Sequence, residues 1–477
     1  MHIIDLTIFI VYMLVMLGVG FFFLRKNEST DDYYVGGRRM GSWHVGLSVV
    51  ATDVGGGFSI GLGGLGFTMG LSGSWMLFTG LLGAWLAAVF LIPRVAKLSS
   101  EISLLTFPQI FGHFYNAKVA LLAGIISAIG YVGFTSSQIL AGAKLASASF
   151  VSLDLNTALI IMGVIAIVYT VLGGIKAVIY TDTIQWIILM AGLVFIGLPI
   201  AYLEVGGYEA IKATVAPEFL TFTNINWVTI VNWSITIIPI WFVGMTLYQR
   251  IYACRDEKTA KKAWFIAGLF EWPVMALMGV MLGLFGRVAA DQGMFASLGY
   301  ADIGGLDAEL GLPLLLRSIL PVGLMGLMMS AYFSAIMSTA DSCLMAASGN
   351  LLTDVFGKWL FVGKESKKIM KYGQWLTLTI GALSLVLALY MTDVLELMLY
   401  SYAFMVSGLF VPLLAAFFYR EGSSQAAFAA MLMGGSTTLF LILLEIQLPL
   451  GLDANFYGIM SSLISFIITD KLVKLKS

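Results

Sequence analysis

Charged residues are scarce in this sequence. Asp, Glu, Lys and Arg make up 11% of its 477 residues, whereas hydrophobic residues make up 59%, and the mean hydropathy is +0.94. A soluble chain would carry about 25% charged residues. Apolar runs of about 18 or more residues recur from end to end, so the composition predicts an all-α polytopic membrane protein.

Other scarce residue types exclude further classes of protein. The two cysteines, Cys254 in a charged stretch and Cys343 in an apolar one, predict no stabilising disulfide. The three histidines, His2, His44 and His113, lie near predicted membrane ends without a clustered nucleophile or metal set, which disfavours a membrane-bound enzyme. The absence of a signalling domain disfavours a sensor, and the absence of a basic domain predicts no nucleic-acid partner. The N-terminal apolar run lacks a basic start and a cleavage site, which predicts a retained helix.

Hydropathy predicts thirteen membrane spans. They cover residues 4–24, 43–70, 73–95, 119–148, 155–173, 178–204, 226–249, 263–287, 314–346, 372–392, 394–419, 424–447 and 455–470. With the N-terminus outside the cell, all but four of the 26 lysines and arginines fall on the cytoplasmic side, Arg250 among them; the exceptions are Lys144, Lys212, Arg287 and Arg317. The positive-inside rule therefore predicts a multi-pass protein of the cell (inner or plasma) membrane with a cytoplasmic C-terminus. Cys254 is expected on the cytoplasmic side.

Two predicted spans contain residues that interrupt a helix. The second span holds VATDVGGGF, Val50–Phe58, in which three consecutive glycines each weaken a helix by about 1 kcal/mol relative to alanine. Glycines alone favour a packing face, but the adjacent Asp53 must face the bundle interior or water. Unwinding at Ala51–Gly57 would free carbonyl oxygens, which suit a small cation. The seventh span is interrupted over Ile237–Gly244, which contains Pro239.

The positions of the two interruptions predict an inverted repeat. They fall at the start of two five-span blocks of opposite orientation, the pattern of transporters whose broken helices build a site near the midplane. The predicted division is an N-terminal helix and cytoplasmic loop at 1–42, repeats at 43–204 and 226–419, and C-terminal helices with a short tail at 424–477. The expected fold thus has about 13 helices, a 5+5 inverted repeat and two discontinuous helices.

Polar residues elsewhere in the spans suggest further ligands. Ala335, Ser338, Thr339 and Ser342 follow the spacing of one helical face, where hydroxyls and carbonyls could complete a cation site or simply bond to other helices. Asp182 could be a helix-start carboxylate, hold a second cation or shape the inner exit.

At these positions the sequence resembles the sodium/solute symporter family over essentially the whole chain. The motifs that carry the resemblance are ATDVGGG (Ala51–Gly57), LGGIKAVIYTDTIQ (Leu172–Gln185), LYQRIYACRDEKTAKKA (Leu247–Ala263) and SAIMSTADS (Ser334–Ser342), with YYVGGRR (Tyr33–Arg39) less specific. The family includes sodium-coupled transporters of proline, sugars, sialic acid, pantothenate, choline and monocarboxylates.

The resemblance implies a sodium site and a set of ligands. Its matching positions are the carbonyls of Ala51, Val54 and Ala335 and the hydroxyls of Ser338 and Thr339, with Asp53 at the position of an important aspartate of the sodium/proline branch. A second cation site of some members would fall at Asp182, Ser338, Asp341 and Ser342, although the carboxylate of Asp341 departs from a hydroxyl-only ligand set. The choline branch has tryptophan where Asp53 stands, which disfavours choline.

A small-molecule solute is expected in the cavity between the two interruptions. Candidate residues to line it are Thr52, Phe58, Phe78, Tyr131, Gln138, Trp241, Glu271 and Tyr402. Glu271 is the most informative because an ionisable group inside a membrane is expensive; it could bind a substrate amine, carry a proton or pair with a cation. The solute could be an amino acid, a sugar or a carboxylate, and Asp53 favours an amino acid. Sodium-driven symport is the leading hypothesis, and proton coupling through Asp53, Asp182 or Glu271 is the alternative.

Overall fold

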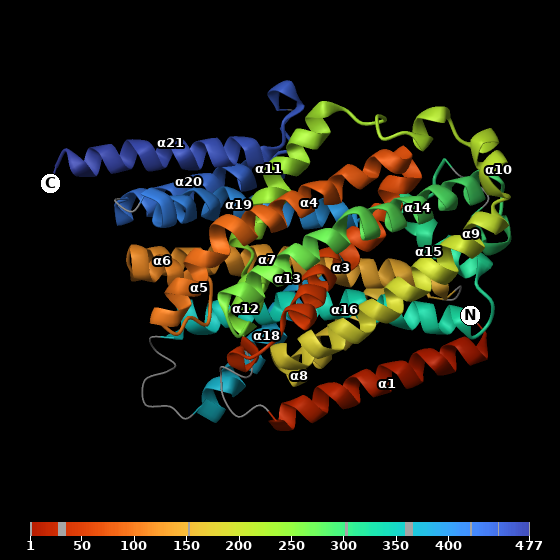
Figure 1. Ribbon diagram of the computed structural model, residues 1–477, viewed down its shortest axis with the longest axis horizontal. Helices are drawn as coiled ribbons and strands as arrows, with labels where there is room; N and C mark the ends of the chain where they lie inside the picture. Colours follow the sequence, from red (N-terminus) through yellow and green to blue (C-terminus); the bar gives the residue numbers. More distant parts are fainter. Residues whose placement is uncertain are drawn as a thin grey trace.

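The computed structural model describes residues 2–26, 35–150, 153–300, 304–357, 366–419, 422–446 and 448–476. All secondary-structure elements of these described residues are helices, apart from one isolated β-bridge that pairs Met40 with Cys254. The predicted all-α class is therefore confirmed. Figure 1 shows long helices running along the long axis of the molecule, with the two chain ends at opposite ends of it.

The long helices fall where hydropathy predicts spans. They are α1 (Ile3–Lys26), α3 (Ser42–Met69), α4 (Trp75–Leu86), α7 (Ala117–Ser149), α8 (Leu155–Gly192), α11 (Trp227–Val243), α12 (Met245–Ala253), α13 (Glu257–Leu269), α14 (Ala276–Asp291), α16 (Leu324–Asn350), α18 (Ser366–Ala388), α19 (Val394–Leu414), α20 (Ser424–Leu443) and α21 (Ala454–Lys474). Shorter helices connect them: α5 (Ile92–Glu101), α6 (Pro108–Phe114), α9 (Leu198–Glu204), α10 (Gly207–Thr214) and α15 (Gly311–Ile319).

Several helical segments can cross a membrane. Within the described residues, seven are long and apolar enough, and α11 with α12 makes an eighth that is bent by 42°. The predicted spans 155–173 and 178–204 both lie along α8 and α9. The predicted span 314–346 is divided, because α15 ends at Ile319 and α16 begins at Leu324 after Gly323, whose φ is 89°. The count of thirteen spans and the two repeats stay predictions.

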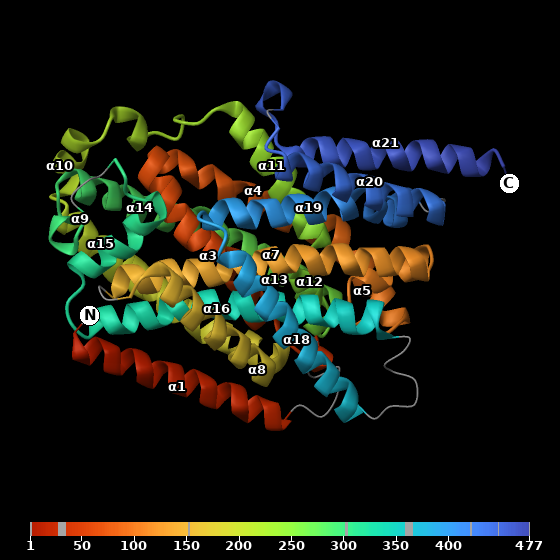
Figure 2. The same cartoon turned by 180° about the vertical axis from the view of Figure 1, so that it is seen from behind.

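The interior is built around α3 and α16. Helix α16 packs against α3, α7 and α8, and α3 also packs against α13 and α14. In both ribbon views α1 lies along one edge and α21 along the opposite edge (Figures 1 and 2). Small residues allow these close contacts: a Cβ at Gly66 of α3 would lie 2.2 Å from the carbonyl oxygen of Val280. Gly66 therefore has the packing role that small residues commonly have between membrane helices.

Helix α1 fixes the start of α16. The Oδ1 atom of Asp5 accepts hydrogen bonds from the backbone N–H groups of Gly323 at 2.6 Å and Gly326 at 2.8 Å. Asp5 is buried, and a Cβ at Gly326 would lie 2.6 Å from its Cα atom. A carboxylate here satisfies N–H groups that the first turn of a helix leaves without a partner.

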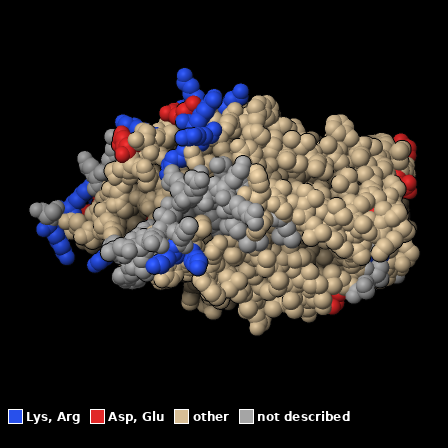
Figure 3. All heavy atoms as spheres, turned by 90° about the horizontal axis from the view of Figure 1, so that it is seen from below, with Lys and Arg blue, Asp and Glu red and all other residues tan. Residues whose placement is uncertain are grey.

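Charge is distributed unevenly over the surface. On the face seen in Figure 3, the Lys and Arg side chains gather toward the end of the molecule where the C-terminus lies, whereas Asp and Glu appear both among them and at the other end. The long middle of this face carries little charge. Such a band is the surface that a membrane protein presents to lipid.

Candidate functional site

The predicted interruption of the second span is present in α3 and is narrower than expected. The non-helical residue is Gly55, with φ 33° and ψ −155°. A side chain here would be strained by the positive φ, and a Cβ would lie 2.6 Å from Thr339 Oγ1 and 2.8 Å from Gln138 Oε1. The absence of a side chain at Gly55 therefore allows the non-helical backbone of α3 and lets α7 and α16 approach it closely.

Side chains take the hydrogen bonds that the interruption releases. The N–H group of Gly56 donates to Gln138 Oε1 at 2.7 Å, and the hydroxyl of Ser59 donates to the carbonyl of Gly55. Gln138, which was expected to contact solute, thus hydrogen-bonds to the backbone at the interruption. Side chains of the protein, rather than water, bind the Gly56 N–H group and the Gly55 carbonyl.

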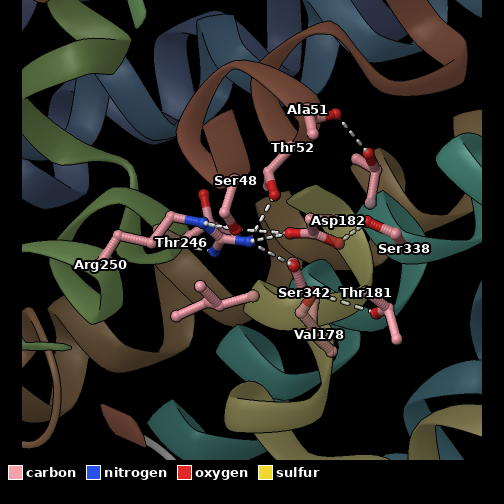
Figure 4. Close-up of polar contacts among 12 residues, drawn as sticks. Ser48, Ala51, Thr52, Val178, Thr181, Asp182, Thr246, Arg250, Ser338 and Ser342 are labelled. Atoms are coloured by element: carbon pink, nitrogen blue, oxygen red, sulfur yellow. Dashed lines mark hydrogen bonds and ion pairs between the residues drawn. The ribbon is translucent and has the colours of Figure 1, made fainter. Parts of the chain in front are cut away.

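Three of the five predicted sodium ligands come together beside this break. Thr339 Oγ1 lies 3.2 Å from the carbonyl oxygen of Ala51 on α3 and 3.3 Å from that of Ala335 on α16. Figure 4 shows the Ala51 carbonyl directed toward α16. Hard oxygen donors suit a hard cation, and ligands about 2.4 Å from such an ion lie about 3.4 Å apart along an octahedral edge. These oxygens therefore fit a small cation. The side chains of Val54 and Phe58 lie outside the described residues.

Ser338, the fourth predicted ligand, faces a different partner. Its hydroxyl donates to Asp182 Oδ1 on α8. The other carboxylate oxygen of Asp182 accepts from Ser48 Oγ at 2.5 Å. Ser338 thus connects the oxygens around Thr339 with a second polar cluster.

Arg250 stands at the centre of this second cluster (Figure 4). Arg250 was counted among the cytoplasmic charges just after the predicted span 226–249, and the structure shows that its side chain on α12 is fully buried. Its Nη2 atom lies 3.2 Å from Asp182 Oδ2. Its other contacts are Nε to Ser48 Oγ at 3.0 Å, Nη1 to the Thr246 carbonyl at 3.1 Å, and Nη2 to Ser342 Oγ at 3.0 Å and to Thr52 Oγ1.

The residues considered for a second cation have different partners in the structure. Asp182 and Ser342 both bind Arg250, so the guanidinium supplies the positive charge at their position. Asp341 instead accepts from Thr170 Oγ1 at 2.5 Å, and its Oδ2 atom has no hydrogen-bond partner among the described residues. Thr52, considered as a solute contact, belongs to the Arg250 cluster.

The second predicted interruption lies at a different residue. Helix α11 continues through Pro239 and ends at Val243, and the chain bends by 42° at Gly244 before α12 begins. The bend thus lies within the predicted range Ile237–Gly244, at its last residue and not at Pro239. Tyr131 of α7 packs at this bend, where its hydroxyl accepts from the N–H group of Thr246 at 3.0 Å.

A third interruption, not predicted, carries Glu271. It is the segment η6 (Phe270–Met275), in which Trp272 has φ −134° and ψ 125°. Such bulges inside helices are frequent at functional sites. Glu271 is fully buried, and it fits because Gly80 of α4 has no side chain: a Cβ there would lie 2.2 Å from Glu271 Oε2.

Glu271 faces Asp53 across the helix interface. The two carboxyl groups are buried within electrostatic contact of each other. The two carboxyl groups share a side-chain hydrogen bond, which requires a proton on one of them. No other described residue donates to Asp53 Oδ2 or to either Oε atom of Glu271. Tyr402 of α19 lies in electrostatic contact with both. The structure thus brings together three of the residues singled out in the sequence.

The remaining aromatic candidates surround this pair. Trp241 is fully buried, and a Cβ at Gly83 would lie 2.4 Å from its Cδ1 atom. Phe78 of α4 stacks edge-on against Trp272, with ring centroids 5.2 Å apart. Gly80 and Gly83 lie on one face of α4, so Glu271 and Trp241 contact neighbouring turns of the same helix.

Comparison with known proteins gives the same assignment along the chain. The model of the sodium:solute symporter family matches residues 33–434. The osmoregulated proline transporter OpuE of Bacillus subtilis is 26% identical over 477 residues, which cover 97% of this chain and 94% of that protein. The sodium/proline symporter of Escherichia coli is 27% identical over 91% of this chain and 87% of its own. A solved sodium-coupled sialic acid symporter, in a substrate-bound outward-open state, superposes with a TM-score of 0.80 at 21% identity, over 99% of this chain and 98% of that one.

Proposed function

The chain belongs to the sodium:solute symporter family, and we propose that it imports a small polar organic solute by alternating access, driven by a sodium gradient. Its relatives are transporters and not enzymes. The observation that carries the proposal is the convergence of Thr339 Oγ1 with the carbonyls of Ala51 and Ala335 beside the break in α3.

Sodium would be held by the carbonyls of Ala51, Val54 and Ala335 and the hydroxyls of Ser338 and Thr339. When bound, it supplies a positive charge that joins α3 to α16. Ser338 would turn from Asp182 toward this site, since its hydroxyl lies on the helix face that Thr339 shares. Because Asp53 lies two residues from Ala51, its carboxylate adds negative potential to the site.

We infer one sodium site rather than two. Asp182 is ion-paired with Arg250, and the same guanidinium also binds Ser342. A second cation at these residues would have to displace a fully buried arginine. Linkage then requires that sodium and solute raise each other's affinity by the same factor.

The proposed orientation has the N-terminus outside and the C-terminus in the cytoplasm. The gathering of Lys and Arg toward the end of the molecule that holds the C-terminus supports it (Figure 3). Import then follows the inward sodium gradient of a cell.

Uptake into proteoliposomes tests the proposal. The purified protein is reconstituted and offered radiolabelled amino acids, beginning with proline because that solute is named for the relatives. Uptake should require an inward sodium gradient and should collapse when the gradient is removed. Uptake that follows a proton gradient without sodium would instead establish the alternative, proton coupling through buried carboxyls such as Asp53 and Glu271.

A further inference from the structure

We propose that the groove between α19 and α21 binds an anionic phospholipid, whose acyl chain lies along the groove and whose phosphate lies beside Lys471 and Arg94. The inference goes beyond symport and does not depend on which solute is carried. The groove has a volume of about 600 Å³, which lies within the range of about 300–1,000 Å³ that small-molecule sites occupy. Its apolar walls are formed by Phe410, Leu414 and Phe418 on one side and by Leu463, Phe466 and Ile467 on the other.

The groove opens toward lipid. Helix α21, and α19 together with its continuation η10 (Ala415–Tyr419), are each long and apolar enough to cross a membrane. Helix α21 lies along an edge of the molecule (Figures 1 and 2). The apolar side chains of Phe418, Leu463 and Ile467 are 48%, 38% and 44% exposed. In a bilayer such side chains meet acyl chains, so the walls suit the hydrocarbon part of a lipid.

One end of the groove is polar. There the hydroxyl of Tyr419 donates to Asp470 Oδ2 at 3.4 Å, and Lys471 follows on the same wall. Ile459 marks the other end, and the twelve-residue step from Ile459 to Lys471 covers about 18 Å of α21. Half of the hydrocarbon core of a bilayer is about 15 Å thick. The groove therefore has the length of an acyl chain within one leaflet, with its polar end at the headgroups.

The acidic group at the polar end already has its partners. Asp470 Oδ1 accepts from the backbone N–H group of Ser423 at 2.8 Å, and Lys474 Nζ lies 3.1 Å from Asp470 Oδ2. Lys471, which also lines the groove, forms no ion pair among the described residues. Its positive charge is therefore available to a ligand.

A second cation stands beside this groove. The guanidinium carbon of Arg94 on α5 lies 4.1 Å from the centroid of the Phe418 ring, which is part of the wall. Arg94 donates to the carbonyl of Phe90 at 2.6 Å and has no carboxylate partner in the part of the chain that the structure describes. Two cations without acidic partners beside an apolar groove match a ligand with an apolar chain and a negative headgroup.

An anionic phospholipid meets these requirements better than the alternatives. A zwitterionic lipid brings a cationic group that cancels the charge of its phosphate. A second copy of this chain, related by a two-fold axis, would bring the same two cations face to face. Basic pockets between membrane helices on the cytoplasmic side bind anionic headgroups, and the proposed orientation places the polar end on that side.

Lipid titrations of the detergent-purified protein test the inference. Dioleoylphosphatidylglycerol and dioleoylphosphatidylcholine share their acyl chains and differ in headgroup charge, and native mass spectrometry counts the lipids bound at each concentration. The phosphatidylglycerol should bind at least fivefold more tightly. Glycerol 3-phosphate carries the phosphate without a chain and should leave no bound adduct at the same concentrations.

Variants assign the binding to the groove. Lys471→Gln and Arg94→Gln should each weaken phosphatidylglycerol binding about fivefold, since a basic residue near a membrane surface contributes about 1 kcal/mol, and should leave phosphatidylcholine binding unchanged. Leu463→Trp narrows the groove and should weaken the binding of both lipids. Lys476→Gln is the matched control, because Lys476 is an exposed lysine beyond the end of α21 that does not line the groove, and it should have no effect.

Each contrary outcome identifies a different occupant. Equal affinity for the two lipids overturns the inference, and so does an equal loss in Lys471→Gln and Lys476→Gln, which would indicate attraction by the basic surface as a whole. Tight binding of glycerol 3-phosphate alone would assign the two cations to a free phosphate and would also overturn it. A dimer that lipid does not displace and that Leu463→Trp abolishes would place a second copy in the groove instead of a lipid.

The charge variants and the groove variant test the site separately, so one that fails to fold leaves the others to decide. None of these binding measurements involves a sodium gradient. Uptake that does not require sodium would refute the proposed function and would leave the lipid result standing, whereas equal binding of the two lipids would refute only the lipid site.

Discussion

Two buried acidic groups on or beside α3 differ in how their charge is compensated. Asp182 receives hydrogen bonds from Ser48, Ser338 and Arg250, so its cluster is neutral and fully bonded. Asp53 and Glu271 share a hydrogen bond, and no other described residue donates to Asp53 Oδ2 or to either Oε atom of Glu271. The first cluster contains an ion pair, whereas the second is a pair of acidic groups.

Because their charges are compensated differently, the two clusters should respond differently to substitution. Removing one partner from a buried ion pair leaves an uncompensated charge, which is strongly destabilising. Replacing one carboxyl group of a buried acidic pair by an amide removes the contact between like charges and keeps a hydrogen-bond donor. Substitutions at the two clusters should therefore have opposite effects on stability, although all four side chains are buried acids or bases in the same helix bundle.

The largest effect is expected at the cluster that contains the ion pair. Asp182→Asn or Arg250→Met alone should destabilise the protein by about 3–5 kcal/mol, because each leaves the other charge buried and unpaired. The double variant should lose less than the sum of the two. Urea unfolding of the detergent-purified proteins measures this coupling. Additive losses would show that the two side chains do not act as a pair.

The second-largest effect, on sodium dependence, is expected at the hydroxyl of Thr339, which meets the Ala51 carbonyl. Thr339→Ala removes the hydroxyl that meets the Ala51 carbonyl, so the sodium concentration for half-maximal uptake should rise at least tenfold, about 1.4 kcal/mol. Thr339→Ser keeps the oxygen and should be mild. Thr377→Ala is the matched control, since Thr377 is a buried threonine whose hydroxyl bonds within its own helix. Equal damage from serine and alanine would indicate packing volume rather than an ion ligand.

A smaller effect of opposite sign is expected at the acidic pair. Without solute, Glu271→Gln should leave Tm unchanged or raise it, because the amide keeps a hydrogen-bond donor beside Asp53 and removes one member of a buried acidic pair. Thermal unfolding in nanodiscs compares it with Asp182→Asn under the same conditions. A loss of stability as large as that of Asp182→Asn would abolish the distinction between the two clusters.

The smallest effect is expected at Cys254, which follows the helix that carries Arg250. The thiol is buried, and burial raises its pKa to about 12, so the thiol stays protonated well above neutral pH. Reaction with an impermeant maleimide should stay negligible between pH 7 and pH 9. The charged stretch around Cys254 thus does not make its thiol accessible.

Lys258→Cys in a Cys254→Ser background provides the accessible comparison, and it should react only from the cytoplasmic face. Its labelling from outside intact cells would reverse the proposed orientation. Rapid labelling of Cys254 itself in the wild type would show that the end of α12 opens, and with it the cluster around Arg250.

Much of the fold and part of the site could be predicted from the sequence. Hydropathy located the long helices because lipid requires continuous apolar segments, and three glycines beside Asp53 located the break now found at Gly55. The spacing of Ala335 and Thr339 predicted one helix face, and their oxygens do lie together.

The remaining features depend on tertiary contacts. The sequence alone places Arg250 just after a predicted span. Its ion pair with Asp182 can be recognised only once the position of α12 in the bundle is known. The break at Trp272 does have a local signal, because Trp272 precedes Pro273 and a proline disfavours helical dihedrals in the residue before it. The bend at Gly244, five residues after Pro239, has no such signal. The pairing of Asp53 with Glu271 joins residues more than 200 positions apart, and helical periodicity carries no information about such distant contacts.

The cap that Asp5 places on α16 has a consequence for protein engineering. The family model begins at residue 33, so α1 lies outside the matched region, yet it binds the first turn of the helix that carries Ser338 and Thr339. A chain shortened to the matched region would lose a cap of about 0.5–2 kcal/mol. Bulky fusions should therefore be placed at the C-terminal end, because a tag ahead of Asp5 would lie next to the contact with the helix that carries the proposed sodium ligands Ser338 and Thr339.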